Sequence, residues 1–249
     1  IGNDANNGTL PFSAFTSLDL NSQINTQASA LNGQGGFIET SGHTLNMLAT
    51  INAGRGGMWL IDPYDIIVGD TASGTAYSSS FTAGQVSYIR ASDIVASLNN
   101  NINVSITTGS STANTIAVYA AITATTGSAS LTLTGGTIAL SASITTFGSQ
   151  TYNGNIYVAA PNVSVVSNNG DVTVNGGIQN YNNAITLTSA GAYTSSLTGA
   201  GNANSTGVLV GDVLLKWTGS QFTFTTPTAQ SLSYLVVGGG GGEIGRAHV

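Results

Sequence analysis

The sequence predicts an all-β protein and, within that class, a right-handed parallel β-helix: a solenoid with a less regular excursion and a strand-rich C-terminal tail. Two observations lead to this prediction. Val, Ile and Thr dominate the chain and glycine recurs every few residues, with no sustained helical period. In addition, an apolar residue followed by others two and six places later recurs about every 20 residues, a period typical of solenoids.

This repeated spacing of three apolar residues has a simple physical interpretation. Residues i and i+2 of a strand point to the same side, and the third apolar residue reaches the interior again after a corner. Stacked coils would bury such residues in columns, where each Ile, Val or Leu contributes about 1.5–3 kcal/mol. A Greek-key sandwich is the alternative fold, but it does not predict the repeated spacing of three apolar residues. The copies are Leu45, Met47 and Ile51; Ile116, Val118 and Ile122; Ile138, Leu140 and Ile144; Val172, Val174 and Ile178; and, one residue longer, Ile156, Val158 and Val163.

The repeat divides the chain into segments. Residues 1–65 are expected to form β-helix coils that end in the stretches GGFIETSG and WLIDPYD, and residues 116–191 are expected to form further coils. Residues 66–115 are interpreted as an irregular excursion, and residues 192–242 as a linker and the start of a glycine-rich module. The chain begins at Ile1 with no leader-like segment, and it is expected to be a fragment of a longer polypeptide. Residues 243–249, EIGRAHV, resemble a translated sequencing adaptor and are interpreted as an artefact.

The excursion contains the one helix that the sequence predicts. The stretch ASDIVASLNN, residues 91–100, allows one or two helical turns. Ser92 is the expected N-cap, and Ile94, Val95 and Leu98 fall on one face.

Composition excludes several classes of function. Charged residues make up 6% of the chain, against about 25% in an ordinary globular domain, but the hydrophobic fraction of 41% allows a sizeable core. The four Lys and Arg residues within a net charge of −6 form no basic patch for nucleic acid or acidic membranes. The absence of cysteine excludes disulfides and thiolate metal sites. Apolar runs are too short for membrane insertion.

Two stretches, GGFIETSGHTLNM and INAGRGGMWLIDPYDIIV, resemble the filamentous-haemagglutinin-type family of exported adhesins, which use two-partner secretion. The resemblance extends over about 20–190 of the chain, and the Trp-Leu-Ile-Asp-Pro stretch is its most specific part. The tail FTFTTPTAQSLSYLVVGGGGG resembles the opening of glycine-rich surface modules. The signature positions, which we expect to be structural, are Gly35, Gly36, Phe37, Ile38, Glu39, Thr40, Ser41, Gly42, Trp59, Leu60, Ile61, Asp62, Pro63 and Asp65.

The resemblance implies a secreted or cell-surface bacterial protein with a β-helical shaft. Its partners would be glycans or proteins on host or neighbouring cells and, during export, an outer-membrane transporter. Nucleic acid is not an expected partner, and this segment is not expected to enter a membrane. We expect a rigid shaft and display surface with no cofactor, no metal and no catalytic residue, and therefore not an enzyme.

Two acidic sites were candidates for chemistry. Glu39 and His43 are four residues apart, about 13 Å on a strand, and one Glu with one His makes neither a triad nor a metal site. Asp62 and Asp65 form a better pair, because paired carboxylates hydrolyse glycosidic bonds. We favour a structural turn there, since Asp-Pro initiates turns. A carbohydrate-active β-helical enzyme using both aspartates is the alternative function, and a trimeric phage tail-spike segment is a third.

Aromatic residues were the remaining candidates for ligand contact. Trp59 and Tyr64 could stack on a sugar, but Trp59 lies in an apolar run and is expected in the core. An exposed aromatic strip is a further, irregularly spaced candidate, formed by Tyr119, Tyr152, Tyr157 and Tyr181.

Overall fold

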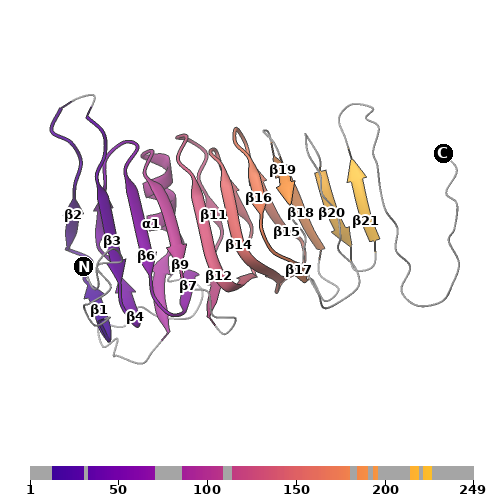
Figure 1. Ribbon diagram of the computed structural model, residues 1–249, viewed down its shortest axis with the longest axis horizontal. Coiled ribbons are helices and arrows are strands. Elements are labelled where there is room, and N and C mark those ends of the chain that lie inside the picture. The colour runs from indigo at the N-terminus through magenta and orange to yellow at the C-terminus, as the bar shows by residue number, and fades with distance from the viewer. Residues whose placement is uncertain are drawn as a thin grey trace, which may run out of the picture.

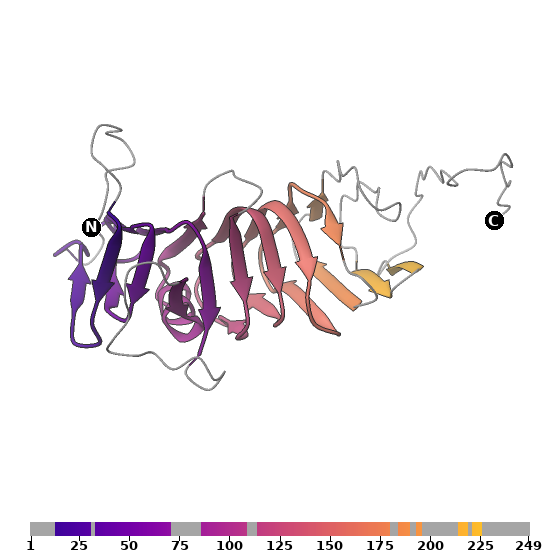
Figure 2. The ribbon, with the colours of Figure 1, turned by 90° about the horizontal axis from the view of Figure 1, so that it is seen from below.

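The strands of the protein lie side by side along its long axis, nearly in sequence order (Figure 1). The computed structural model describes residues 13–30, 33–70, 86–108, 114–179, 184–189, 193–195, 214–218 and 221–225. A view at right angles shows strands on different sides of a common interior, with the helix among them (Figure 2).

Three ladders of hydrogen-bonded strands run along the stack, and a typical coil contributes one strand to each. The first ladder consists of β1 (Phe15–Leu18), β4 (Thr44–Met47), β8 (Ser87–Arg90), β7 (Ile66–Gly69), β10 (Thr115–Val118), the second halves of β12 (Leu131–Leu140) and β14 (Gln150–Val158), and β17 (Ile178–Gln179). The second consists of β2 (Gln23–Asn25) and β5 (Thr50–Asn52), and then of β11 (Ile122–Thr123), β13 (Ile144–Thr146), β15 (Val163–Ser167), β18 (Ala184–Ser189), β20 (Leu214–Thr218) and β21 (Gln221–Thr225). The third consists of β3 (Phe37–Ser41), β6 (Met58–Asp62), β9 (Asn103–Thr107), the first halves of β12 and β14, β16 (Val172–Val174) and β19 (Tyr193–Ser195).

Pairing in these ladders is parallel, with two exceptions at the far end, where β20 pairs antiparallel with both β18 and β21. The all-β prediction with parallel strands is therefore confirmed. A Greek-key sandwich is excluded, because its sheets are antiparallel.

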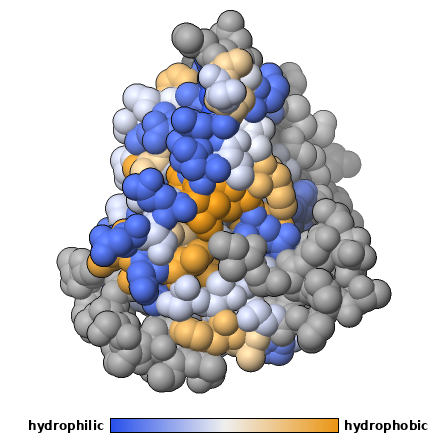
Figure 3. Space-filling view, turned by 90° about the vertical axis from the view of Figure 1, so that its left-hand side faces the viewer, coloured by the Kyte–Doolittle hydropathy of each residue, from blue (hydrophilic) through white to orange (hydrophobic). Residues whose placement is uncertain are grey.

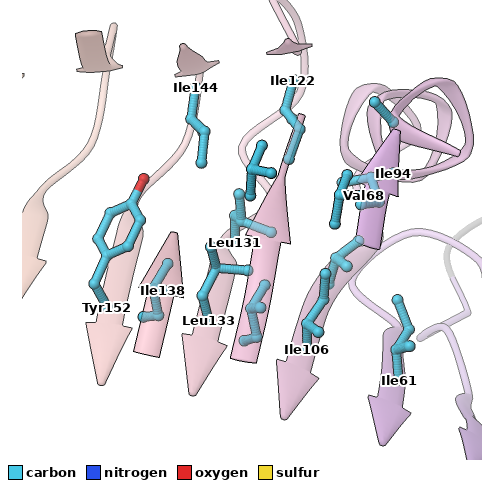
Figure 4. Close-up of a cluster of buried hydrophobic side chains, with 14 of the residues drawn as sticks. Ile61, Val68, Ile94, Ile106, Ile122, Leu131, Leu133, Ile138, Ile144 and Tyr152 are labelled. Atoms are coloured by element: carbon cyan, nitrogen blue, oxygen red, sulfur yellow. The ribbon is translucent and has the colours of Figure 1, made fainter. Parts of the chain in front are cut away.

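The inward side chains form apolar columns along the ladders. On the third ladder, Ile61, Ile106, Leu133 and Tyr152 lie opposite one another on successive strands, and all four are fully buried. Figure 4 shows this row, with Ile144 pointing toward it from the opposite side. Seen from the first coil, hydrophobic residues gather at the centre and hydrophilic residues lie around them (Figure 3). Burial of these columns supplies the main stabilisation of the stack.

The predicted spacing of the apolar residues is correct, but one of the five predicted copies lies at a different corner of the coil. Ile138 lies opposite Ile156 on the first ladder, and Ile156 lies opposite Ile178. Val172 and Val174, predicted to begin an equivalent copy, instead lie on strand β16 of the third ladder. The physical reason is that the chain turns a similar corner from the third ladder to the first, so the same apolar spacing arises at two different corners.

Helix α1 (Ala91–Asn99) confirms the predicted helix and packs against β5 and β11, where the second ladder would otherwise have a strand. Ile94 and Leu98 are buried and Val95 is partly buried, as expected for one inward face. The predicted Ser92 cap is wrong, because the residue before the helix is Arg90 and its side chain makes no capping bond.

Arg90 instead links the helix to the coil below through hydrogen bonds of its side chain. Its guanidinium donates to both carboxylate oxygens of Asp93, at 2.6 and 2.8 Å, and to the carbonyl oxygen of Leu48, at 3.0 Å. Burial raises the pKa of Asp93, while the hydrogen bond and the charge of Arg90 act in the opposite direction.

Strands β7 and β8 lie on the first ladder in reversed sequence order. Strand β8 pairs with β4 and β7, and β7 pairs in turn with β10. Two strands thus separate β4 from β10, whereas β9 alone separates β6 from β12 on the third ladder. A helix is about 10–12 Å wide, roughly two strand spacings, so α1 fills on the second ladder the height that two strands fill on the first. In its described residues, the segment interpreted as an irregular excursion therefore contributes β7, β8, α1 and β9 (Asn103–Thr107) to the stack.

Candidate functional site

The two stretches of the adhesin-like signature lie on adjacent strands of the third ladder. Strand β3 pairs in parallel with β6 and forms with it one continuous patch. The register joins Phe37 to Met58, Ile38 to Trp59, Glu39 to Leu60, Thr40 to Ile61 and Ser41 to Asp62. Segments that are separate in the sequence thus form a single structural unit.

The inward side of this patch contains a buried hydrogen bond. The indole Nε1–H of Trp59 donates to Oγ1 of Thr40 at 3.0 Å, and both residues are fully buried. The Thr40 hydroxyl also lies 3.4 Å from the carbonyl oxygen of Leu60, to which it donates. Trp59 is a core residue, as expected, and is not available to stack on a sugar.

The signature glycines lie where the coils approach closely. A Cβ on Gly35 would lie 2.5 Å from the carbonyl oxygen of Ala53, and one on Gly36 would lie 2.6 Å from Oγ1 of Thr26. The N–H of Gly42 donates to the carbonyl oxygen of Asp62 at 3.2 Å. These positions require residues without side chains, which gives the glycines a structural role.

The outward side of the patch has an acidic pair that the sequence did not suggest. The pKa of Asp62 is raised to about 6, first because partial burial disfavours its charge and second because the Glu39 carboxylate lies near it. Asp65 is engaged elsewhere, since its Oδ1 accepts the backbone N–H of Thr115 at 2.7 Å. The charge that acts on Asp62 is therefore that of Glu39 on the adjacent strand. Asp65 has a different role, because its hydrogen bond connects the start of β7 to the start of β10.

His43 and Tyr64 meet at the corner beyond these strands. Their ring centroids are 4.0 Å apart with planes inclined at 41°, and Tyr64 is 49% exposed. His43 thus contacts an aromatic ring. Among the residues that the structure describes, no group of three or more His, Asp or Glu side chains could hold a metal ion.

The candidate tyrosine strip, which the irregular spacing did not favour, is not formed by the residues that the structure describes. Tyr152 is fully buried, donates its hydroxyl to Oε1 of Gln150, and has its pKa raised by burial. Tyr119 is 54% exposed and Tyr157 is half-buried, whereas Tyr181 lies outside the described residues. Tyr152 fails as a surface residue because it occupies an inward position of its strand, in the column next to Leu133.

The outward side of the third ladder carries a row of hydroxyl groups. The sequence favours exposed ladders of Thr, Ser and Asn in general, but it does not identify the members of this row. The row is in register across β9, β12, β14 and β16, with one half-buried residue from each strand. Neighbouring members are about 4.8 Å apart, the spacing of paired strands. Within the described part of the chain, none of the four hydroxyls makes a hydrogen bond to the protein. The members of this central row are Ser105, Thr132, Thr151 and Thr173.

The rows on either side are hydrogen-bonded from strand to strand. On one side, the amide of Asn175 donates to Oδ1 of Asn153 at 2.8 Å, and the amide of Asn153 donates to Oγ1 of Thr134 at 3.1 Å. On the other, the hydroxyl of Ser130 donates to Oδ1 of Asn103 at 2.9 Å. The central row is thus held between two rigid rows while its own hydroxyls remain available.

Comparison of the chain with protein-family models, with curated proteins and with solved structures finds no match. In the described residues, no helix has the length and apolar character needed to cross a membrane.

Proposed function

We propose that this chain is a shaft segment of a secreted bacterial surface adhesin, built as a right-handed parallel β-helix. The observation that carries the proposal is that the signature residues form two stacked strands. The inward polar groups of Thr40 and Trp59 bond to each other, and Asp65 holds the start of a neighbouring strand. The right-handed sense follows from the general preference of parallel β-strand connections. Such a shaft would act as a spacer and display surface on the cell, and an outer-membrane transporter would export it.

The central row is the part of this shaft that we propose to contact a glycan. Threonine and serine hydroxyls both donate and accept hydrogen bonds, as sugar hydroxyls do. Because the row repeats at the strand spacing, a linear polysaccharide lying along the shaft would meet one hydroxyl on each of four strands. Such repeated weak contacts add to a higher overall affinity.

Charge favours a neutral glycan over an acidic one. The outward residues of β9, β12 and β14 on this ladder are uncharged. Glu39 and Asp62 lie beyond one end of the row, and the exposed Asp171 precedes β16 at the other. These carboxylates would repel sulfated or uronic-acid chains.

The test is binding of the purified chain to a panel of neutral and acidic polysaccharides. The triple variant Thr132→Val, Thr151→Val, Thr173→Val removes three hydroxyls of the row at nearly constant shape. We expect retention on neutral polysaccharide to fall at least about tenfold, because several repeated contacts are lost. The matched control is Thr123→Val with Thr145→Val, two paired outward threonines of the second ladder, which should bind like the parent. Equal binding by both variants would contradict the glycan assignment.

The alternative function, polysaccharide cleavage through Asp62 and Asp65, is tested on the same panel by measuring new reducing ends or unsaturated products. The shaft proposal predicts no turnover. Turnover that is lost in Asp62→Asn and in Asp65→Asn would favour the enzyme, and a trimer in sedimentation would favour the tail-spike reading.

A further inference from the structure

The outward side of the adjacent strands β3 and β6 carries three apolar side chains close to the central row (Figure 1). Phe37 is 55% exposed, and Met58 and Leu60 are half-buried. Phe37 lies opposite Met58 in the ladder, and Leu60 follows Met58 by two residues, so all three are on the same side. We call these three residues the apolar patch.

The apolar patch is in register with the central row. Leu60 lies opposite Ser105, the first member of that row, and the pairing continues without a shift to Thr173. Met58 lies opposite Asn103, which belongs to one of the rigid rows beside it. A ligand that follows the central row toward the first coil therefore passes from hydroxyl groups onto hydrocarbon and then reaches the exposed ring of Phe37.

These two surfaces correspond to the two surfaces of a pyranose ring. The hydroxyls of the sugar stand around the edge of the ring, where they can exchange hydrogen bonds with threonine and serine hydroxyls. When the ring substituents are equatorial, C–H groups cover both faces of the sugar. Such a face packs against the negatively polarised face of an aromatic side chain.

The spacing of the row selects the way in which the sugars are joined. A pyranose linked through opposite ring carbons advances its chain by about 5 Å, given ordinary bond lengths. This advance is close to the spacing of paired strands, about 4.8 Å. Equatorial bonds at both linkage positions keep the chain straight, so successive sugars meet successive strands, whereas an axial bond makes the chain curve away from the row.

We propose that the third ladder binds a straight, neutral, β-1,4-linked glycan with one sugar on each strand, and that Phe37 stacks on the sugar nearest the first coil. The inference rests on the proposed function, because it names the glycan that the central row would take. Met58 and Leu60 form the apolar floor beside that sugar. Glu39 lies opposite Leu60 and Asp62 follows Leu60 by two residues, so an acidic sugar would be repelled at this end.

Titration of the unmodified chain with glucose oligosaccharides, followed by nuclear magnetic resonance, tests the linkage. The β-1,4-linked pentasaccharide should bind at least about tenfold more tightly than the β-1,4-linked disaccharide, because it contacts more strands. It should also bind at least about tenfold more tightly than the α-1,4-linked pentasaccharide, since the curved chain loses most of these repeated contacts. Equal affinity for the two linkages, or for the two lengths, would overturn the assignment of a straight chain.

Variants of Phe37 test the stacking contact with the same pentasaccharide. Phe37→Ala should weaken binding about fivefold, and Phe37→Trp, which keeps an aromatic face, should bind at least as tightly as the parent. The matched control is Tyr119→Ala, which removes a ring of 54% exposure directly after β10 of the first ladder and should leave binding unchanged. Unchanged binding by Phe37→Ala, or an equal loss in Tyr119→Ala, would overturn the role of Phe37.

Failure of this inference can be told apart from failure of the proposed function. If the triple variant of Thr132, Thr151 and Thr173 loses neutral polysaccharide while Phe37→Ala binds like the parent, the stacking contact falls and the central row stands. If the unmodified chain binds neutral polysaccharides without preferring the β-1,4 linkage, the straight-chain assignment alone falls. If the unmodified chain binds no neutral glycan, both proposals fall together.

Discussion

Replacing Thr40 by Val should remove the one acceptor that the described residues offer to the buried indole N–H of Trp59. The bond is 3.0 Å long and both side chains are fully buried. Valine has nearly the shape of threonine, so the change opens no large cavity. The cost is then that of a buried donor without a partner, about 1–3 kcal/mol. The second contact of the hydroxyl, 3.4 Å from the Leu60 carbonyl oxygen, is long and should add little.

Urea denaturation followed by far-ultraviolet circular dichroism measures this cost through the shift in midpoint at constant slope. The control is Thr132→Val, the same substitution at a half-buried outward position of the third ladder, where about 0.5 kcal/mol or less is expected. A Trp59→Phe background gives the sharper comparison, because the donor is then absent. Thr40→Val should cost about 1 kcal/mol less in that background than in the parent.

Two results would refute this reasoning. One is a Thr40→Val effect equal to that of Thr132→Val. The other is an unchanged effect in the Trp59→Phe background, which would assign the cost to packing and not to the hydrogen bond.

Further predictions concern charge and close packing. The pKa of Asp62 is raised to about 6 in the folded protein, from about 3.9 in an unfolded chain. The contribution of this group to the free energy of unfolding should therefore be full below about pH 4 and be lost as the pH rises through about 6. Asp62→Asn should abolish this part of the pH dependence and Glu39→Gln should reduce it, as measured by urea midpoints across that range. Gly154→Ala should lower the free energy of unfolding by about 3 kcal/mol, because the new Cβ would lie 1.9 Å from the Gly135 carbonyl oxygen. A urea midpoint near that of the parent would contradict this close approach. Asp65→Asn should lower the free energy of unfolding by about 1 kcal/mol, because it turns a charge-assisted hydrogen bond to the first N–H of β10 into a neutral one. An unchanged thermal midpoint would show that this hydrogen bond contributes nothing to stability.

Burial along the strands could be predicted from the sequence because it depends on a local rule. Ile138, Leu140 and Ile144 were expected to face inward from their spacing, and all three are fully buried. The rule fixes the side of each residue but not the ladder on which a strand lies. For this reason Val172 and Val174 were assigned to the wrong ladder although they do face inward.

Strand order and cross-strand neighbours depend on longer-range geometry. The stretches IIVG and SYIR could each occupy the first ladder, and nothing local shows that the later one lies nearer to the first coil. The pairing of Glu39 with the neighbourhood of Asp62 depends on the length of one whole coil, whereas the sequence suggested Asp65 because it is close along the chain. The composition favoured exposed ladders of Thr, Ser and Asn without saying which residues form them, and only the register aligns Thr132 with Thr151.

The extra strand on the first ladder makes opposite sides of the stack unequal in length. Three strand spacings on one side and two on another differ by about 4.8 Å, and across a thickness of about 10 Å this corresponds to a change of direction of about 25°. Figures 1 and 2 nevertheless show the coils before and after β7 and β8 in nearly one line, so the tilt of the strands and the width of α1 must take up this difference.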